Sequence, residues 1–170
     1  MVFSSLTFIS IFLPAVFILM LIIPSMKAKN VLLVVASLVF YAYGEPVYVL
    51  LMIVSTILNW ASGYAIGKKK MSSASRKALL VCVVVANLAM LGFFKYTPLV
   101  VSSINRCLNL AIPVPAIALP IGISFYTFQA MSYVIDVYRG EVPAQKSYLK
   151  VLLYISFFPQ LIAGPIIKYN

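Results

Sequence analysis

Long apolar runs, separated by short polar or basic segments, make up most of this chain. There are six such runs, Phe8–Ile23, Val31–Tyr43, Val47–Ile66, Ala78–Tyr96, Ala118–Gly140 and Tyr148–Ile167. Because about 20 residues of α-helix cross the hydrocarbon core of a bilayer, we interpret these runs as membrane segments. Val31–Tyr43 is short, and it can cross only if the helix extends to Ala28 and Gly44; otherwise it is re-entrant. The pattern predicts an all-α, polytopic membrane protein.

The first run contains a proline in its middle. Pro14 has no N–H to donate to the carbonyl of Ser10, so we expect a helix kinked at Pro14. A cleaved signal peptide is the alternative, but no Lys or Arg precedes the run and no small-residue cleavage site follows it. We therefore interpret Phe8–Ile23 as a retained helix.

Prolines break the region from Thr97 to Leu119 repeatedly. Within it, only Leu99–Ala111 is predicted to be helical. One face of that helix carries Val100, Ile104, Cys107, Leu108 and Ala111, and the other carries Ser102, Asn105, Arg106 and Asn109. Such an amphipathic helix is expected to lie along the membrane surface without crossing it.

The last run is interrupted twice. Pro159 leaves the carbonyl of Ile155 without its helical donor. Gly164 and Pro165 then stop the helix again. Broken backbone at membrane depth persists only where protein or water satisfies it, and Gln160 beside the first break is a candidate to do so. We expect this segment to line an interior.

Polar residues follow a helical period in the fifth run. Pro120 is predicted to open the helix, because an N–H at that position would be unpaired in any case. One face then carries Gly122, Tyr126, Gln129, Tyr133 and Asp136. An amide and a carboxylate on a membrane helix normally face protein or a hydrated cavity, so the stripe either joins helices or lines a cavity. Arg139 also allows an ion pair with Asp136.

The composition sets the class of protein. Of the 170 residues, 64% are hydrophobic and 9% are charged, and the mean hydropathy is +1.07. A soluble core cannot bury so much apolar surface, so lipid must cover part of it. The net charge of +10 does not indicate nucleic-acid binding, because the basic residues lie in short loops between apolar runs.

Most of the 13 Lys and Arg residues fall in three loops, 24–30, 67–77 and 139–150. If every run crosses, these loops share one side of the membrane, which the positive-inside rule assigns to the cytoplasm. The expected location is the inner membrane, with the N-terminus outside the cytoplasm. Contact with anionic lipid headgroups is a second interpretation of the densest loop, 67–77.

Few residues of this chain are typical of catalysis or of metal binding. There is no histidine, no metal-ligand spacing and no Gly-rich phosphate loop, so we expect no metal site. Cys82 and Cys107 are interpreted as small buried hydrophobic residues. Asn59 is predicted to hydrogen-bond to another helix rather than to take part in catalysis.

Three blocks of sequence resemble a known family. They are Pro120–Gln129 (PIGISFYTFQ), Tyr133–Gly140 (YVIDVYRG) and Phe157–Ile166 (FFPQLIAGPI). Together they resemble the membrane-bound O-acyltransferase family, in the bacterial branch typified by alginate O-acetylation proteins. The branch that loads D-alanine onto teichoic acids is a close relative. Phe40–Gly44 and Phe93–Tyr96 are similar to that branch more weakly, so the resemblance covers nearly the whole chain.

The resemblance implies a ring of transmembrane helices around a tunnel. In that tunnel an acyl group, expected to be acetyl, passes from acyl-CoA or an acyl carrier to a hydroxyl of an exported polysaccharide or cell-envelope glycan. The family's essential residue is a histidine that acts as general base. This sequence has no histidine, and family members are considerably longer, so we expect residues 1–170 to be a truncated N-terminal portion that is inactive alone.

Within that hypothesis, Gln129, Tyr133, Asp136 and Gln160 are tunnel-lining candidates, and none of them is the nucleophile or base. No bound cofactor is expected. The expected partners are the lipid bilayer, the acyl donor or its carrier protein on the cytoplasmic side, and other exopolysaccharide-modification proteins. The alternatives are a non-catalytic membrane protein, such as a transporter half, channel subunit or scaffold, and a split enzyme completed by a second polypeptide.

Overall fold

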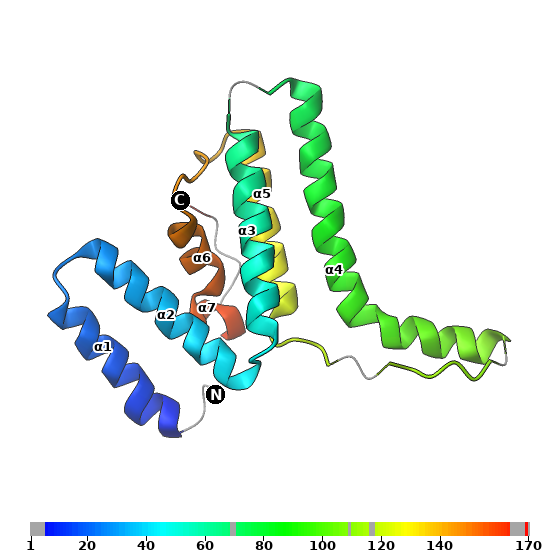
Figure 1. Cartoon of the computed structure of the whole chain (residues 1–170), viewed down its shortest axis with the longest axis horizontal. Helices are drawn as coiled ribbons and strands as arrows, with labels where there is room; N and C mark the ends of the chain where they lie inside the picture. The colour runs from blue at the N-terminus through cyan, green and yellow to red at the C-terminus, as the bar shows by residue number, and fades with distance from the viewer. Residues whose placement is uncertain (1–5, 69–70, 109, 116–117, 164–168, 170) are drawn as a thin grey trace.

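The computed structural model describes residues 6–68, 71–108, 110–115, 118–163 and 169, with the backbone alone for 161–163. None of these residues is in a strand. In chain order the elements are a π-helix, η1 (Phe8–Phe12), and the α-helices α1 (Leu13–Ile22), α2 (Met26–Gly44), α3 (Tyr48–Ile66), α4 (Ser73–Leu108), α5 (Ile123–Arg139), α6 (Tyr148–Ser156) and α7 (Phe158–Ala163). The predicted all-α class is confirmed (Figure 1).

Three of the helices in the described part of the chain are long and apolar enough to cross a membrane, namely α2, α3 and α4. The short run Val31–Tyr43 lies within α2, whose 19 residues include both Ala28 and Gly44. The first run forms a shorter apolar helix, Phe8–Ile22. The last run holds two short helices, α6 and α7, where the sequence predicted one interrupted segment. These lengths confirm a polytopic membrane protein, although not every run makes a full span.

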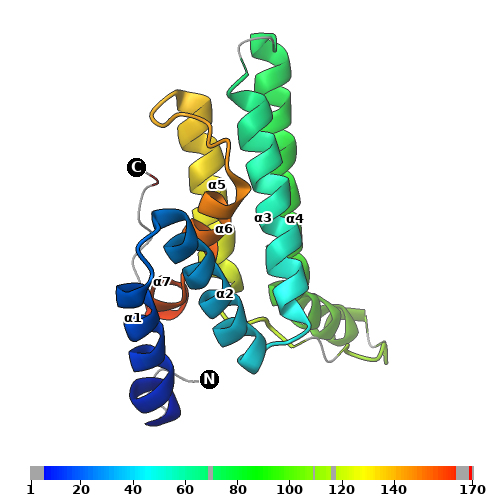
Figure 2. The same ribbon diagram turned by 60° about the vertical axis from the view of Figure 1, so that its left-hand side comes forward.

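Helix α5 lies at the centre of the bundle. It packs against α3, α4, α6 and α7, and Figures 1 and 2 both show it beside α3. Two glycines let neighbouring residues come close to α3. Gly63 on α3 faces the ring of Tyr133, and Gly67 at the end of α3 faces Ala144 in the loop before α6. Small residues at helix contacts are how membrane helices approach one another closely.

The fourth run and the expected surface helix form one continuous helix, α4, which corrects their prediction as separate elements. Pro98 lies inside α4, and Figure 1 shows the last turns of α4 running away from the bundle. A proline in a helix interior removes one hydrogen bond and bends the helix without necessarily ending it. Thr97 Oγ1 donates to the carbonyl of Phe93 at 2.6 Å, just before the proline.

The side chains of α4 correct two further expectations. The helix ends at Leu108, so Ala111 lies beyond it. Cys82 and Cys107 are free and exposed, where the sequence predicted that both are buried. Both therefore lie on the exposed surface of α4. An interfacial position for the end of α4 stays a prediction.

The N-terminal helix is irregular in the turn that precedes Pro14 and contains Ser10, and a kink at Pro14 stays a prediction. Residues Phe8–Phe12 are π-helical, and the N–H of Leu13 donates to the carbonyl of Phe8. Pro14 follows inside the continuous helix of residues 8–22, where its missing N–H leaves the carbonyl of Ser10, within η1, without its usual helical donor. This element is held by an aromatic cluster of Phe8, Phe12, Phe40 and Phe158, with ring centroids 5.3–6.0 Å apart.

The predicted break in the last run is present, but it lies at Phe157, between α6 and α7, rather than at Pro159. Pro159 is in the first turn of α7. The N–H of Phe158 donates to Ser37 Oγ on α2 at 3.3 Å. A side chain of another helix therefore satisfies one backbone N–H at the break. That Gln160 satisfies the carbonyl of Ile155 stays a prediction. Gly164 and Pro165 lie outside the described residues.

Candidate functional site

The boundaries of α5 come from two glycines. Gly122 precedes the first helical residue with φ 75°, and Gly140 follows the last with φ 78°. Both conformations are left-handed, which glycine adopts at little cost. Pro120 therefore lies in the preceding turn and does not open the helix, which corrects its predicted role. At the other end, the N–H groups of Gly140 and Glu141 donate to the carbonyls of Val137 and Asp136 and close α5.

The polar stripe of α5 faces the interior of the protein. Tyr126, Gln129, Tyr133 and Asp136 are each at most 4% exposed. The opposite face is also buried, because α5 lies between its neighbours rather than at the edge of the bundle. Phe125 and Phe128 remain exposed. Lipid therefore does not reach the amide or the carboxylate, as expected for polar groups in a membrane helix.

Hydrogen bonds tie this stripe to the segments that precede and form α6. Gln129 Nε2 donates to the carbonyl of Tyr154 at 2.6 Å. Tyr133 Oη accepts a hydrogen bond from the backbone N–H of Gln145 at 3.1 Å. These two residues join elements, which is one of the two interpretations left open by the sequence. That they also line a tunnel stays a prediction.

Asp136 has a local partner. Ser132 Oγ, one turn earlier on α5, donates to Asp136 Oδ2 at 3.3 Å. Arg139 does not form the ion pair with Asp136 that the spacing allowed. It lies 3.7 Å from Glu141 in an exposed pair instead. The carboxylate of Asp136 is thus buried beside a hydroxyl of its own helix, and no Lys or Arg of the described residues forms an ion pair with it.

Three tyrosines gather beside the stripe, and sequence reasoning found only one of them. The ring of Tyr169 lies 5.2 Å from that of Tyr133 and 4.9 Å from that of Tyr154. Tyr169 Oη accepts a hydrogen bond from Gln145 Nε2 at 2.8 Å. Tyr154 and Gln145 were missed because nothing in their local pattern marks them as neighbours of α5. Tyr169 follows Gly164 and Pro165 in the sequence, which predict an end to the helical period, so that period does not place it.

Some buried hydroxyls near this region have no hydrogen-bond partner in the described part of the chain. They include Tyr126 Oη, Thr127 Oγ1 and Ser156 Oγ. A buried polar group without a partner costs about 1–3 kcal/mol. Gln160, the remaining candidate, lies on α7, which contacts α5, and its side chain is half-buried. The structure thus brings Gln129, Tyr133 and Asp136 together on α5 and places Gln160 on an adjoining helix.

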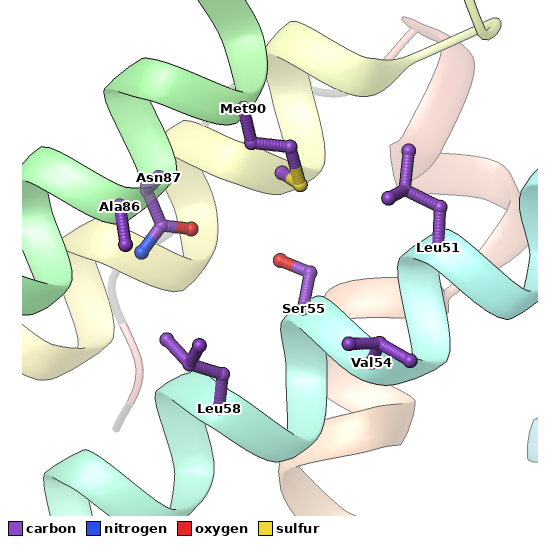
Figure 3. A pocket seen from close by; sticks show the side chains of 7 residues that line it. All are labelled: Leu51, Val54, Ser55, Leu58, Ala86, Asn87 and Met90. Carbon is purple, nitrogen blue, oxygen red and sulfur yellow. The ribbon is translucent and has the colours of Figure 1, made fainter.

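A second polar contact joins α3 and α4. The side-chain amides of Asn59 and Asn87 exchange two hydrogen bonds of 3.0 Å, and each also donates to a carbonyl of its own helix at 2.8 Å. The predicted interhelical role of Asn59 is confirmed. Beside this pair lies an apolar pocket of about 180 Å³. Ser55 lines it and points into it (Figure 3). The pocket contains no titratable side chain.

The chemistry available to the described residues is limited. No three His, Cys, Asp or Glu side chains lie together among them, and the sequence holds no histidine. Asp136 is the single carboxylate on the stripe. Tyrosine hydroxyls and amides can orient a ligand by hydrogen bonds, but they do not titrate near neutral pH. These residues are therefore suited to binding and positioning.

An all-α bundle with a buried polar helix between apolar helices defines the class of this protein, a polytopic membrane protein. The whole chain aligns with a probable alginate O-acetylase of Pseudomonas aeruginosa, at 39% identity over 174 residues that cover 33% of that relative. A probable alginate O-acetylase of Azotobacter vinelandii is also 39% identical, with 35% of it covered. A peptidoglycan O-acetyltransferase of Helicobacter pylori is 31% identical over 199 residues, which cover 37% of it.

The chain spans about a third of the length of these curated relatives. No family model matches it. No solved structure matches it either. These relatives belong to the membrane-bound O-acyltransferase family, and the chain is similar, over its full length, to their N-terminal third.

Proposed function

We propose that this chain is the N-terminal part of an O-acetyltransferase that transfers acetyl groups to hydroxyls of an exported polysaccharide or cell-envelope glycan. The observation that carries the proposal is the similarity, over the whole chain, to relatives named for alginate O-acetylation and peptidoglycan O-acetylation. Both names describe O-acetylation, one of alginate and one of peptidoglycan. The proposed acyl donor is acyl-CoA or an acyl carrier on the cytoplasmic side of the inner membrane, with other exopolysaccharide-modification proteins as partners.

In this proposal, the stripe of α5 forms part of a tunnel wall. Its support is the burial of Gln129, Tyr133 and Asp136 together with the unpartnered hydroxyls of Tyr126 and Thr127 on the same helix. Unsatisfied hydroxyls on the same helix as a buried carboxylate suit a site where substrate hydroxyls would supply the missing partners. Gln160 on α7 would continue the wall.

The general base in this proposal comes from outside residues 1–170, because the sequence has no histidine. General-base catalysis at neutral pH needs a group that titrates in that range. The side chains on α5 then act by positioning. They would hold the acceptor or the donor where a base from elsewhere in the assembled enzyme can reach the reacting hydroxyl.

A chimera tests this proposal. Residues 1–170 replace the matching N-terminal third of the Pseudomonas aeruginosa relative, in a strain that lacks that relative, and acetyl esters on the secreted alginate are measured. We expect acetylation to return. Asp136→Asn, which keeps the shape of the side chain, should lower it about tenfold, equivalent to about 1.4 kcal/mol of transition-state stabilisation.

The matched control is Glu45→Gln, the same chemical change in the turn before α3, whereas Asp136 is next to Val137 at the far end of α3. It should leave acetylation unchanged. A chimera that reaches the membrane at the parental level but leaves alginate unacetylated would contradict the proposal and favour a non-catalytic role. Equal losses in the two variants would remove Asp136 from the site.

A further inference from the structure

A basic pocket lies at the end of the bundle where α3 and α5 finish and α4 begins. Its volume is about 420 Å³, and it is lined by the end of α3, by α4 and by the loop after α5. Figures 1 and 2 show these segments at the same end of the molecule. Lys68 and Arg76 are its charged lining residues, and a Cβ added at the lining residue Gly140 would have nothing within 4 Å.

Arg76 has unused donor capacity in this pocket. Its Nε is buried and has no hydrogen-bond partner among the described residues. One other nitrogen, Nη2, donates to the carbonyl of Tyr138 at 3.4 Å, and the guanidinium lies 5.7 Å above the ring of Tyr138. The ring fixes the orientation of the guanidinium without neutralising its charge. A buried arginine donor without a partner is costly unless an acceptor binds there.

Lys68 also lines the pocket. Its Nζ lies 4.6 Å above the ring of Tyr64 on α3. Both cations of the pocket are therefore positioned by tyrosine rings, one on α3 and one on α5. This arrangement leaves their N–H groups available to an anion.

The residues that line the pocket include neither Asp nor Glu, so no carboxylate in its wall neutralises the two cations. Glu141, next to the lining residue Gly140, lies 3.7 Å from Arg139. Asp136 is buried beside Ser132. The third acidic residue, Glu45, is in the turn between α2 and α3, at the end of α3 that lies away from the pocket.

We infer that this pocket binds a phosphate group, and that the phosphate belongs to the headgroup of an anionic phospholipid. Guanidinium and ammonium groups are the usual protein partners of phosphate. The other walls are apolar, with Ile66, Val137 and Val142. The pocket lies at the ends of membrane helices, where basic residues and tyrosines meet lipid headgroups. A soluble phosphate compound offers the same chemistry without the acyl chains that these walls would accept.

The test is native mass spectrometry of the full chain, purified in detergent, with phosphatidylglycerol or phosphatidylcholine added at equal concentration. We expect phosphatidylglycerol to be retained preferentially. Arg76→Gln should reduce its retention roughly tenfold, because the buried charge-assisted contact is lost. The matched control is Lys77→Gln, which removes the same charge from an exposed neighbouring residue and should change retention less than about twofold.

A second arm adds inorganic phosphate without lipid. Phosphate alone could protect the wild type, but not Arg76→Gln, against thermal unfolding while neither lipid is preferred. That result would keep the phosphate site but assign it to a soluble ligand. Equal losses in Arg76→Gln and Lys77→Gln would overturn the site, since only net charge would then matter. The site would also be overturned if neither phosphatidylglycerol nor inorganic phosphate bound to the wild-type protein or stabilised it. The readout involves no acetyl transfer, so it is independent of the proposed function.

Discussion

Tyr133 on α5 contacts α3, the loop before α6 and Tyr169 at the centre of the molecule. Its ring packs against Gly63 of α3 and Tyr169, and its hydroxyl accepts a hydrogen bond from the N–H of Gln145. A Cβ placed on Gly63 would lie 2.8 Å from Cε1 of the ring, closer than real carbon contacts allow. The position of the whole polar stripe relative to α3 therefore depends on the absence of one methyl group.

Gly63→Ala should destabilise the protein by about 1–3 kcal/mol, because the ring of Tyr133 cannot retreat from its packed site. The measurement is thermal or denaturant unfolding in detergent micelles. Gly92→Ala is the matched control, since Gly92 is also in a membrane helix but a Cβ added there would have nothing within 4 Å. It should be neutral or stabilising by up to about 1 kcal/mol. Equal effects at both positions would show that the Tyr133 contact is not decisive.

At the scale of elements, α4 shows how a proline can bend a helix that continues. The N–H missing at Pro98 leaves the carbonyl of Phe94 without its helical donor, and the chain resumes a helix to Leu108. Cys82 and Cys107 are free, exposed and placed on either side of Pro98. They therefore form a natural pair of labelling sites that reports the bend.

Pro98→Ala should straighten α4. The distance between spin labels at Cys82 and Cys107, measured by pulsed electron paramagnetic resonance, should increase towards about 37 Å, the length of about 25 residues at roughly 1.5 Å each. Pro113→Ala, outside the helix, is the control and should leave the distance unchanged. An identical distance in wild type and Pro98→Ala would mean that packing, not the proline, sets the bend.

At the scale of the whole molecule, basic loops gather at one end. Lys68 and Arg76 come from the connection between α3 and α4, and the pocket that they line includes Gly140 and Pro143 from the loop after α5. The structure thus places loops 67–77 and 139–150 at the same end, as the alternation of spans requires. The positive-inside rule assigns this end to the cytoplasm, which stays a prediction.

Cysteine accessibility tests that orientation. In a variant with Cys82 and Cys107 replaced by serine, Ser72→Cys should react with a membrane-impermeant maleimide only after the inner membrane is permeabilised. Val114→Cys, exposed at the other end of α4, should react in intact cells whose outer membrane alone is opened. The opposite labelling pattern would invert the topology.

The sequence alone determined the class of the protein and the face of its central helix. Apolar runs and basic loops predicted a polytopic all-α protein, and the 3.6-residue period predicted which side chains of α5 share a face. Asn59 was predicted to bond between helices, and it does so with Asn87. These features are local, because hydropathy and helical period are properties of neighbouring residues in the chain.

Only the tertiary structure decided which groups meet. Ser37, 121 residues earlier in the chain, accepts the N–H of Phe158 beside the break at Phe157. Tyr169 packs against Tyr133, although the two are 36 residues apart. The same holds for α4, whose continuation through Pro98 no local breaker rule predicted. A proline removes a backbone hydrogen bond at a known position, which has a local cost in free energy. The group that then satisfies the unpaired backbone atom depends on how distant helices pack. For that reason the position of a break can be predicted only approximately, and the group that satisfies it not at all.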